Sequence, residues 1–167
     1  SYPYQVKKKY KNFEIRNYEA NLFTSVKLSS NSYKRSSRKG FSILAGYIFG
    51  KNDKQEKISM TSPVTMSLED SVAMMFMVPK KFKKEELPKP NESEIEFKQI
   101  PAKKMAAISF GGWANDKKIE KYKNQLIEHL KKENIQHSNR FYFFGYNSPY
   151  EFFNRKNEVL FPIEIPK

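Results

Sequence analysis

The sequence predicts an α+β domain in which a distorted antiparallel β-barrel carries two helices on its outside. Three observations favour this class. Only two stretches have helical periodicity, the other apolar stretches are short and extended, and the order strand, helix, strand, strand occurs twice. The two halves cover about residues 10–80 and 93–166. We therefore expect a single domain over residues 1–167 with an architectural repeat.

The predicted strands are short apolar runs bounded by turns. We expect extended segments at residues 10–28, 58–66, 72–78, 95–100, 105–110, 141–146 and 158–165. The run Val72–Val78 is apolar on both faces and is predicted to be a central strand. Pro63 cannot donate a hydrogen bond to a ladder, so we expect a bulge or a sheet edge there. Residues 79–93 are charged, contain three prolines and link the two halves.

Two helices are predicted from their apolar stripes. The first spans about residues 32–49 and ends at Gly50, since glycine favours helix C-termini. The second begins at Asn115 or Asp116, both good N-caps, and runs to about residue 133. Neither half holds two helices that could cover both faces of a parallel sheet. Closing an antiparallel sheet into a barrel would remove its exposed edges.

Composition limits the classes of partner. The net charge is +13, but 26 of the 31 basic residues are lysine. Base readout and bidentate phosphate contacts favour arginine, so we expect no nucleic-acid binding and interpret the lysines as a solvated surface. No apolar run approaches the ~18 residues of a membrane-spanning helix. The chain has no cysteine, which excludes disulfides and thiolate metal sites. We expect a monomer, and the cellular compartment is left open.

No group of residues indicates catalysis or a metal site. The two histidines, His129 and His137, have no second ligand three or four residues away. No carboxylate pair indicates acid–base chemistry, since Glu85, Glu86, Glu92, Glu94 and Glu96 are expected to face solvent and Asp53 to lie in a turn. The sequence has neither a phosphate-binding glycine loop nor a nucleophile elbow. The sequence therefore predicts a protein that is not an enzyme.

The first helix is the candidate for ligand binding. Its apolar stripe includes Phe41, Leu44, Ala45 and Ile48, and Arg38 lies one turn before Phe41. Such stripes usually face a core, and that interpretation stays open for Leu44 and Ile48. The small residues of the helix would also let a flat ligand or another backbone approach closely. An apolar wall with a cationic rim suits an apolar disc that carries carboxylates.

Four motifs follow one another along the chain. They are Phe13-Glu14-Ile15-Arg16-Asn17-Tyr18, the segment Gly46–Met66, Gly145-Tyr146-Asn147-Ser148-Pro149 and Asn157-Glu158-Val159. Through them nearly the whole chain resembles the SOUL/haem-binding-protein family. The resemblance implies a distorted antiparallel barrel built from a duplicated βαββ unit with two flanking helices, as in bacterial effector-binding domains. It also implies an apolar cleft that binds a tetrapyrrole, either haem or free porphyrin.

The resemblance places this cleft between the first helix and a loop near the C-terminus. The implied ligand contacts are Arg38, Phe41, Leu44, Ala45, Ile48 and Asn17, together with Tyr150 and Phe153 of the loop at residues 147–155. The arginine that matches Arg38 is associated in the family with a haem propionate. We therefore expect Arg38 to meet a carboxylate of the ligand.

Two positions depart from the family pattern. Some members have a histidine, proposed as the axial haem ligand, where this chain has Asn17. A second basic helix residue, proposed to meet a propionate, is replaced by Gly46. We therefore expect binding through apolar contact and propionate pairing. A methionine thioether can in principle ligate haem iron, but the spacing selects none of the six methionines.

Three other functions stay open beside the favoured one, a non-enzymatic tetrapyrrole carrier or buffer. The first is an effector-type module that binds another apolar small molecule. The second is an enzyme that acts on a tetrapyrrole or hydrolyses a small apolar substrate. The third is binding to a protein or to a membrane surface, for which the lysine charge is the only indication.

Overall fold

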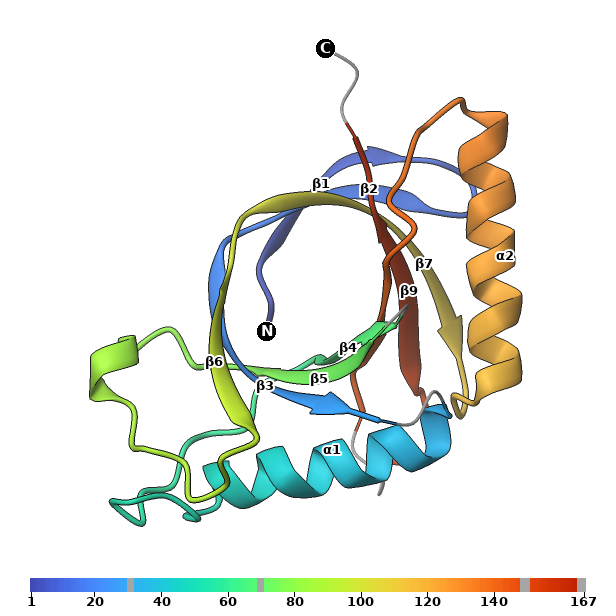
Figure 1. Ribbon diagram of the computed structural model, residues 1–167. Coiled ribbons are helices and arrows are strands. Elements are labelled where there is room, and N and C mark those ends of the chain that lie inside the picture. The colour runs from blue at the N-terminus through green and yellow to red at the C-terminus, as the bar shows by residue number, and fades with distance from the viewer. Residues whose placement is uncertain (30–31, 69–70, 148–150, 165–167) are drawn as a thin grey trace.

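In the described part of the chain nine strands form one antiparallel sheet that curls into an incomplete barrel (Figure 1). The computed structural model describes residues 1–29, 32–68, 71–147 and 151–164. The strands are β1 (Tyr4–Lys9), β2 (Glu14–Tyr18), β3 (Asn21–Leu28), β4 (Val64–Leu68), β5 (Val72–Met77), β6 (Ile95–Ile100), β7 (Lys103–Gly111), β8 (Phe141–Gly145) and β9 (Lys156–Pro162). Their order across the sheet is β1-β2-β7-β9-β8-β4-β5-β3-β6. Among these described strands β1 and β6 pair on one side only, so the expected closure of the barrel is not observed.

The helices α1 (Tyr33–Ile48) and α2 (Asp116–Lys132) lie on the outside of the curled sheet (Figure 1). Helix α1 packs on β3 and β5, and α2 packs on β7 and β9. Each helix therefore contacts the strand that precedes it and the second strand that follows it. This arrangement confirms the predicted α+β class with two flanking helices.

The helix ends follow from local hydrogen bonds. Asn115 caps α2, because its side-chain oxygen accepts a bond of 2.8 Å from the backbone N–H of Lys118. The carboxylate of Asp116 accepts a bond of 2.8 Å from the backbone N–H of Tyr33, which ties the start of α1 to the start of α2. The negative charge of Asp116 is favourable there, because both helix N-termini carry positive partial charge.

Two apolar clusters cover the two faces of the sheet. Leu44 and Leu126 belong to the cluster between the sheet and the helices and are fully buried. The second cluster fills the inside of the barrel. There the ring of Tyr2 lies 4.6 Å from that of Tyr18 and 5.2 Å from that of Phe23. About 10 Å³ of free space remains beside Tyr2, so this part of the interior is filled by the protein's own side chains.

The strand boundaries differ from the prediction in the first half of the chain. Strand β1 is not predicted, because most of its side chains are polar and exposed at the sheet edge and show no alternation. The predicted segment at residues 10–28 is two strands, β2 and β3, separated by Glu19 and Ala20.

Further differences concern β4, β7 and β9, and β7 spans Lys103–Gly111 where residues 105–110 were predicted. The strand predicted at residues 58–66 begins only at Val64, directly after a cis peptide bond between Ser62 and Pro63. Because β4 pairs with both β5 and β8, Pro63 marks the start of a central strand, and the expectation of a bulge or a sheet edge was wrong. Strand β9 spans Lys156–Pro162, where residues 158–165 were predicted.

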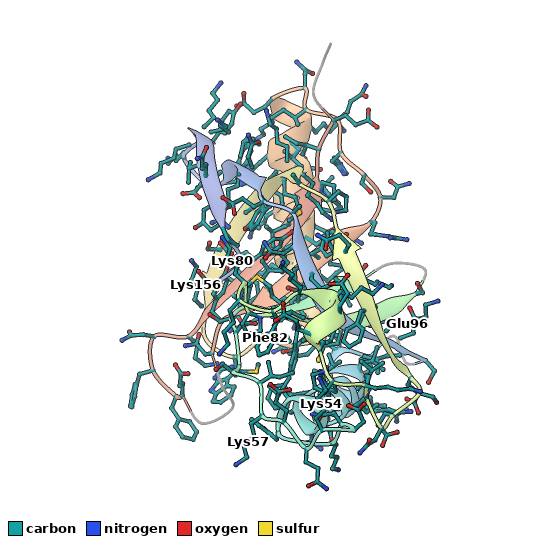
Figure 2. All side chains as sticks on the ribbon, turned by 90° about the vertical axis from the view of Figure 1, so that its left-hand side faces the viewer. Lys54, Lys57, Lys80, Phe82, Glu96 and Lys156 are labelled. Carbon is teal, nitrogen blue, oxygen red and sulfur yellow. The ribbon has the colours of Figure 1, made fainter. Side chains whose placement is uncertain are left out.

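Lysine side chains cover much of the outer surface. Figure 2 shows Lys54 and Lys57 projecting away from the ribbon, and both are exposed. No helix in the described part of the chain is long and apolar enough to cross a lipid bilayer.

Candidate functional site

A pocket of about 750 Å³ lies between α1 and the outer face of β4 and β8. Its wall on α1 and the residue after it consists of Tyr33, Ser37, Arg38, Phe41, Ser42, Ala45, Gly46 and Phe49. Its floor is formed by Val64, Met66, Met74, Phe143 and Gly145. Its opposite wall is formed by Trp113, Ala114, Asn147, Arg155 and Asn157. Both halves of the chain therefore contribute to the pocket.

Helix α1 presents two different faces. Phe41 and Ala45, four residues apart, face the pocket. Leu44 and Ile48 lie on the other face, and their exposed fractions are 0% and 4%. At 3.6 residues per turn these two pairs lie on neighbouring stripes. Leu44 and Ile48 therefore belong to the core and do not line the pocket.

Gly40 also lies on the core face of α1. A Cβ atom at this position would come within 3.0 Å of Leu28 Cδ1 and of Met74 Cβ. The glycine therefore lets the helix approach the sheet closely, which is one of the two roles expected for the small residues of this helix.

The floor of the pocket is apolar and rigid. Met66, Met74 and Phe143 are buried, and Phe143 is held edge-on by the ring of Tyr33 at a centroid distance of 5.2 Å. Phe41 packs edge-on against Phe76, at 5.5 Å. Aromatic pairs of this geometry are favourable beyond their buried area, so these contacts help to hold the Phe41 and Phe143 rings in place.

Cationic groups lie at the rim. Arg38 is exposed on α1 and lines the pocket. On the opposite wall the Arg155 guanidinium stacks over the Trp113 ring at 3.8 Å, and Arg155 Nη1 donates to the Glu151 carbonyl at 2.7 Å. Burial raises the pKa of Tyr33 above its ordinary value, so this phenol stays protonated and can donate a hydrogen bond.

A further lysine lies across the end of α1. The Lys51 side chain covers Gly46, since a Cβ atom at Gly46 would lie 3.2 Å from Lys51 Cδ and 3.9 Å from Lys51 Nζ. The chain folds back here because Gly50 has a φ of +119°, and the Lys51 backbone N–H donates to the Gly46 carbonyl at 3.0 Å. The exposed Lys51 side chain thus lies next to Gly46, a residue of the pocket wall, at the position where the helix itself lacks a cation.

Two described residues implied by the resemblance, Asn17 and Phe153, do not join the pocket wall. Asn17 lies in β2 opposite Lys104, and β7 and β9 separate β2 from the pocket strand β8. Phe153 is 86% exposed and points to solvent, and it is not among the residues that line the pocket. Tyr150 lies outside the described residues.

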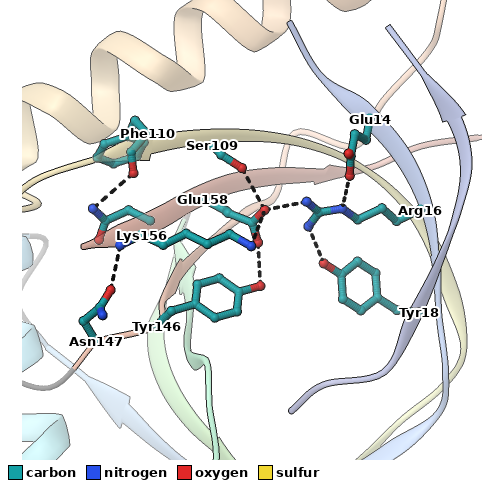
Figure 3. Close-up of polar contacts among 10 residues, drawn as sticks. Glu14, Arg16, Tyr18, Ser109, Phe110, Tyr146, Asn147, Lys156 and Glu158 are labelled. Carbon is teal, nitrogen blue, oxygen red and sulfur yellow. Dashed lines mark hydrogen bonds and ion pairs between the residues drawn. The ribbon is translucent and has the colours of Figure 1, made fainter. Parts of the chain in front are cut away.

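A buried polar network inside the barrel fixes one end of the pocket (Figure 3). Arg16 Nη2 donates to Glu158 Oε2 at 2.6 Å, and Ser109 Oγ donates to the same oxygen at 2.9 Å. The Tyr146 hydroxyl donates to Glu158 Oε1 at 2.5 Å. Arg16 Nη1 donates to the Tyr18 hydroxyl at 2.9 Å. Both charges of the central ion pair are therefore desolvated, and each is hydrogen-bonded to further polar groups, Arg16 to Glu14 and Tyr18 and Glu158 to Ser109 and Tyr146.

The network sets the charge states of its members and holds the β8–β9 connection. Burial alone would raise the pKa of Glu158, but the hydrogen bond and charge of Arg16 and the hydroxyl of Tyr146 hold it below its ordinary value. Burial and the charge of Glu158 raise the pKa of Tyr146. The connection is closed at its base, because the Lys156 backbone N–H donates to Asn147 Oδ1 at 2.6 Å and the Tyr146 N–H donates to the Lys156 carbonyl at 3.2 Å.

Sequence reasoning missed several residues of the pocket. Trp113 lies in the connection between β7 and α2, where no periodicity gives a direction to the side chain. Phe143 and Met66 lie in strands whose apolar residues alternate between the two faces of the sheet, and only the placement of α1 shows which face borders a cavity. The single tryptophan, which directly follows Gly111-Gly112, was the one available signal.

Two other candidates are weaker. His129 packs against Phe13 and His137 against Phe161, and no group of three His, Asp or Glu side chains in the described residues could hold a metal ion. A shallow groove of about 480 Å³ on α2 has a wholly polar lining that includes Lys121 and Glu128. It offers no apolar wall to a ligand.

The curled sheet, the two outer helices and the pocket define an effector-binding-like α+β fold. The structure matches the EcmrR C-terminal domain with a TM-score of 0.72 and 14% identity, over 96% of this chain and 98% of that one. It matches a hydrolase from Listeria innocua with a TM-score of 0.63 and 10% identity, over 95% and 94%. It matches the structure of SAV2435 bound to tetraphenylphosphonium with a TM-score of 0.54 and 9% identity, over 91% of this chain and 93% of that one. At these identities the similarity shows the fold alone.

Sequence comparison identifies the family. The family described as SOUL heme-binding protein matches residues 1–162, and the chain belongs to it. Heme-binding protein 2 of Mus musculus is 29% identical over 156 residues, which cover 88% of this chain and 76% of the mouse protein. Heme-binding protein 1 of Xenopus laevis is 27% identical over 157 residues, which cover 89% and 82%. The resemblance inferred from the sequence motifs is thereby confirmed.

Proposed function

We propose that this protein binds haem or a free porphyrin in the pocket beside α1 and acts as a carrier or buffer without catalysing a reaction. The observation that carries this proposal is a pocket of about 750 Å³ with an apolar floor and cationic groups at its rim. Membership of the SOUL heme-binding protein family supports the same ligand class.

The residues present fit a porphyrin in size and chemistry. The pocket volume falls within the ~300–1,000 Å³ of typical small-molecule sites. Phe41 and Phe143 offer ring faces and edges to a flat apolar ligand. Arg38 lines the pocket, and the Lys51 side chain lies against Gly46, which lines the pocket eight positions further along α1, so a cation lies near each of two carboxylates on one ligand.

The pocket does not offer an imidazole to iron. Among its described lining residues the thioethers of Met66 and Met74 and the phenol of Tyr33 are of types that ligate haem iron. Both methionine side chains are buried in the floor, and burial raises the pKa of Tyr33, which disfavours the phenolate that iron would need. Haem, when bound, would bring an iron centre, whereas this chain would supply apolar contact and charge. We therefore expect haemin and metal-free protoporphyrin to bind with dissociation constants within about tenfold of each other.

Titration tests the proposal directly. Trp113 is the single tryptophan and lines the pocket, so its fluorescence should be quenched as haemin or protoporphyrin binds, with saturation at micromolar ligand. A Soret band that shifts in parallel would report the ligand side. Tetraphenylphosphonium serves as a contrasting ligand, since an arginine-rimmed pocket should bind an organic cation poorly. Absence of saturable quenching by both tetrapyrroles would refute the proposal.

A charge variant separates the rim from the apolar floor. Arg38→Ala should weaken binding of the porphyrin dicarboxylate by about 3–10-fold and leave its dimethyl ester within about twofold. Arg35→Ala is the matched control, because Arg35 is exposed on the same helix and does not line the pocket. Equal effects on diacid and diester would show that Arg38 does not pair with a carboxylate.

We propose further that the protein catalyses no reaction, is a monomer and does not bind nucleic acid. A hydrolase occurs among proteins of similar fold, but at 10% identity it shows the fold alone. The lysine-rich composition supports a solvated surface. Sedimentation of the protein alone tests whether it is a monomer, and sedimentation with duplex DNA tests whether it binds nucleic acid.

A further inference from the structure

Large apolar side chains are exposed around the mouth of the pocket. The exposed fractions of Phe49, Trp113, Phe152 and Phe153 are 63%, 46%, 68% and 86%. In the described part of the chain only two other large apolar side chains, Val6 and Met60, are similarly exposed. A cluster of exposed aromatic residues of this size usually marks a binding surface.

These aromatic residues belong to one surface. Phe49 and Trp113 line opposite walls of the pocket. Phe152 packs edge-on against Trp113 at a centroid distance of 5.8 Å, and Phe153 follows it in the chain. The two phenylalanines therefore project from the β8–β9 connection beside the pocket mouth.

The neighbouring helix face is purely cationic. Helix α1 carries Lys34, Arg35, Arg38 and Lys39 and no acidic residue. All four side chains are exposed. Lys34, Arg38 and Ser42 follow one another at four-residue spacing, and both Arg38 and Ser42 line the pocket. The basic stripe thus lies on the same side of α1 as the aromatic mouth, away from the core face.

We propose that the pocket mouth docks on an anionic lipid bilayer. Phenylalanine and tryptophan side chains partition into the headgroup region, and basic side chains next to them are attracted by anionic lipids. A protein partner of acidic character fits less well, because Phe152 and Phe153 protrude from a loop and offer no flat apolar face to a complementary surface. This docking does not depend on the identity of the pocket ligand.

Vesicle binding by the full chain, without porphyrin, tests the proposal. The protein should co-sediment with phosphatidylcholine vesicles that contain roughly one third phosphatidylserine and bind vesicles of pure phosphatidylcholine at least about tenfold more weakly. The emission of Trp113 should shift to the blue on binding, because this side chain lies at the docking surface. Unshifted emission together with co-sedimentation would place the contact elsewhere on the basic surface and overturn the proposal.

Matched variants locate the surface. The double variant Phe152→Ser, Phe153→Ser should lose about tenfold in vesicle affinity, whereas Val6→Ser, Met60→Ser should change it less than about twofold. The double variant Lys34→Glu, Arg35→Glu should lose about tenfold or more in vesicle affinity. The control double variant Lys7→Glu, Lys121→Glu has the same change in net charge and should lose much less affinity. Equal losses in each matched pair would contradict a defined docking face. Porphyrin titrations are made without vesicles, so failure of either proposal is seen independently of the other.

Discussion

Arg16 and Glu158 form an ion pair across the sheet, with 2.6 Å between Arg16 Nη2 and Glu158 Oε2, although 142 positions separate them in the sequence. Their side chains are 4% and 0% exposed. Replacing Glu158 by glutamine removes the fully buried counter-ion of Arg16 and leaves it paired with the partly exposed carboxylate of Glu14, 2.9 Å from Arg16 Nε. We expect Glu158→Gln to lower the free energy of unfolding by about 2–4 kcal/mol, measured by urea denaturation.

The exposed pair Lys80–Glu19 provides the control for this variant. Its side chains are 62% and 59% exposed, so Glu19→Gln should cost less than about 1 kcal/mol. Similar losses for both variants would show that the buried network contributes no more than a surface pair does.

The same carboxylate predicts how stability depends on pH. The pKa of Glu158 lies below its ordinary value of 4.5, so the folded state releases this proton more readily than the unfolded state does. The resulting stabilisation is complete above pH 4.5 and is lost as the pH falls through the folded-state pKa. The difference in unfolding free energy between the wild type and Glu158→Gln should therefore shrink on acidification below pH 4.5. A constant difference from neutral pH to pH 3 would contradict the lowered pKa.

Two glycines of α1 should respond in opposite directions to alanine. Gly40→Ala places a methyl group 3.0 Å from Leu28 and Met74, and overpacking of about 1–3 kcal/mol should exceed the ~1 kcal/mol gain in helix propensity. In Gly46→Ala the new methyl group meets only the flexible Lys51 side chain, so a gain of up to about 1 kcal/mol is expected. Thermal unfolding of both variants tests this difference, and equal shifts of the same sign would disprove it.

Asn52 organises the turn that positions Lys51. Its side-chain amide donates to the carbonyls of Tyr47 and Glu56 at 3.0 and 2.8 Å, and its oxygen accepts from the backbone N–H of Glu56 at 3.0 Å. Because Asn52 is 3% exposed, Asn52→Ala should cost about 2–3 kcal/mol. Asn124→Ala, on the exposed face of α2, should change stability by less than about 0.5 kcal/mol. Calorimetry of the two variants provides the comparison.

Periodicity predicted the elements well and the pocket only in part. The apolar stripes of α1 and α2 and the apolar run of β5 can be recognised in the sequence. Each helix buries one continuous face, and β5 is buried on both faces. Strand β1 was not predicted, because an exposed edge strand has no apolar face that would appear as a pattern in the sequence.

The site residues show the same limit. Arg38 and Phe41 line the pocket as their helical spacing suggested, but Leu44 lies only a turn from Phe41 and faces the core. The boundary between pocket and core on one helix depends on where the β8–β9 connection lies. The position of that connection depends on contacts between segments far apart in the chain, so the local sequence around Asn17 or Trp113 does not predict it.

The pocket walls join segments far apart in the chain, α1 on one side and Arg155 and Asn157 on the other. A molecule bound between them contacts both segments and therefore stabilises the folded domain as a whole. At a hundred times its dissociation constant such a molecule would add ~2.7 kcal/mol to the unfolding free energy. Loaded copies would then outlast empty ones under proteolysis, and the cellular amount of the protein would follow the supply of its cargo.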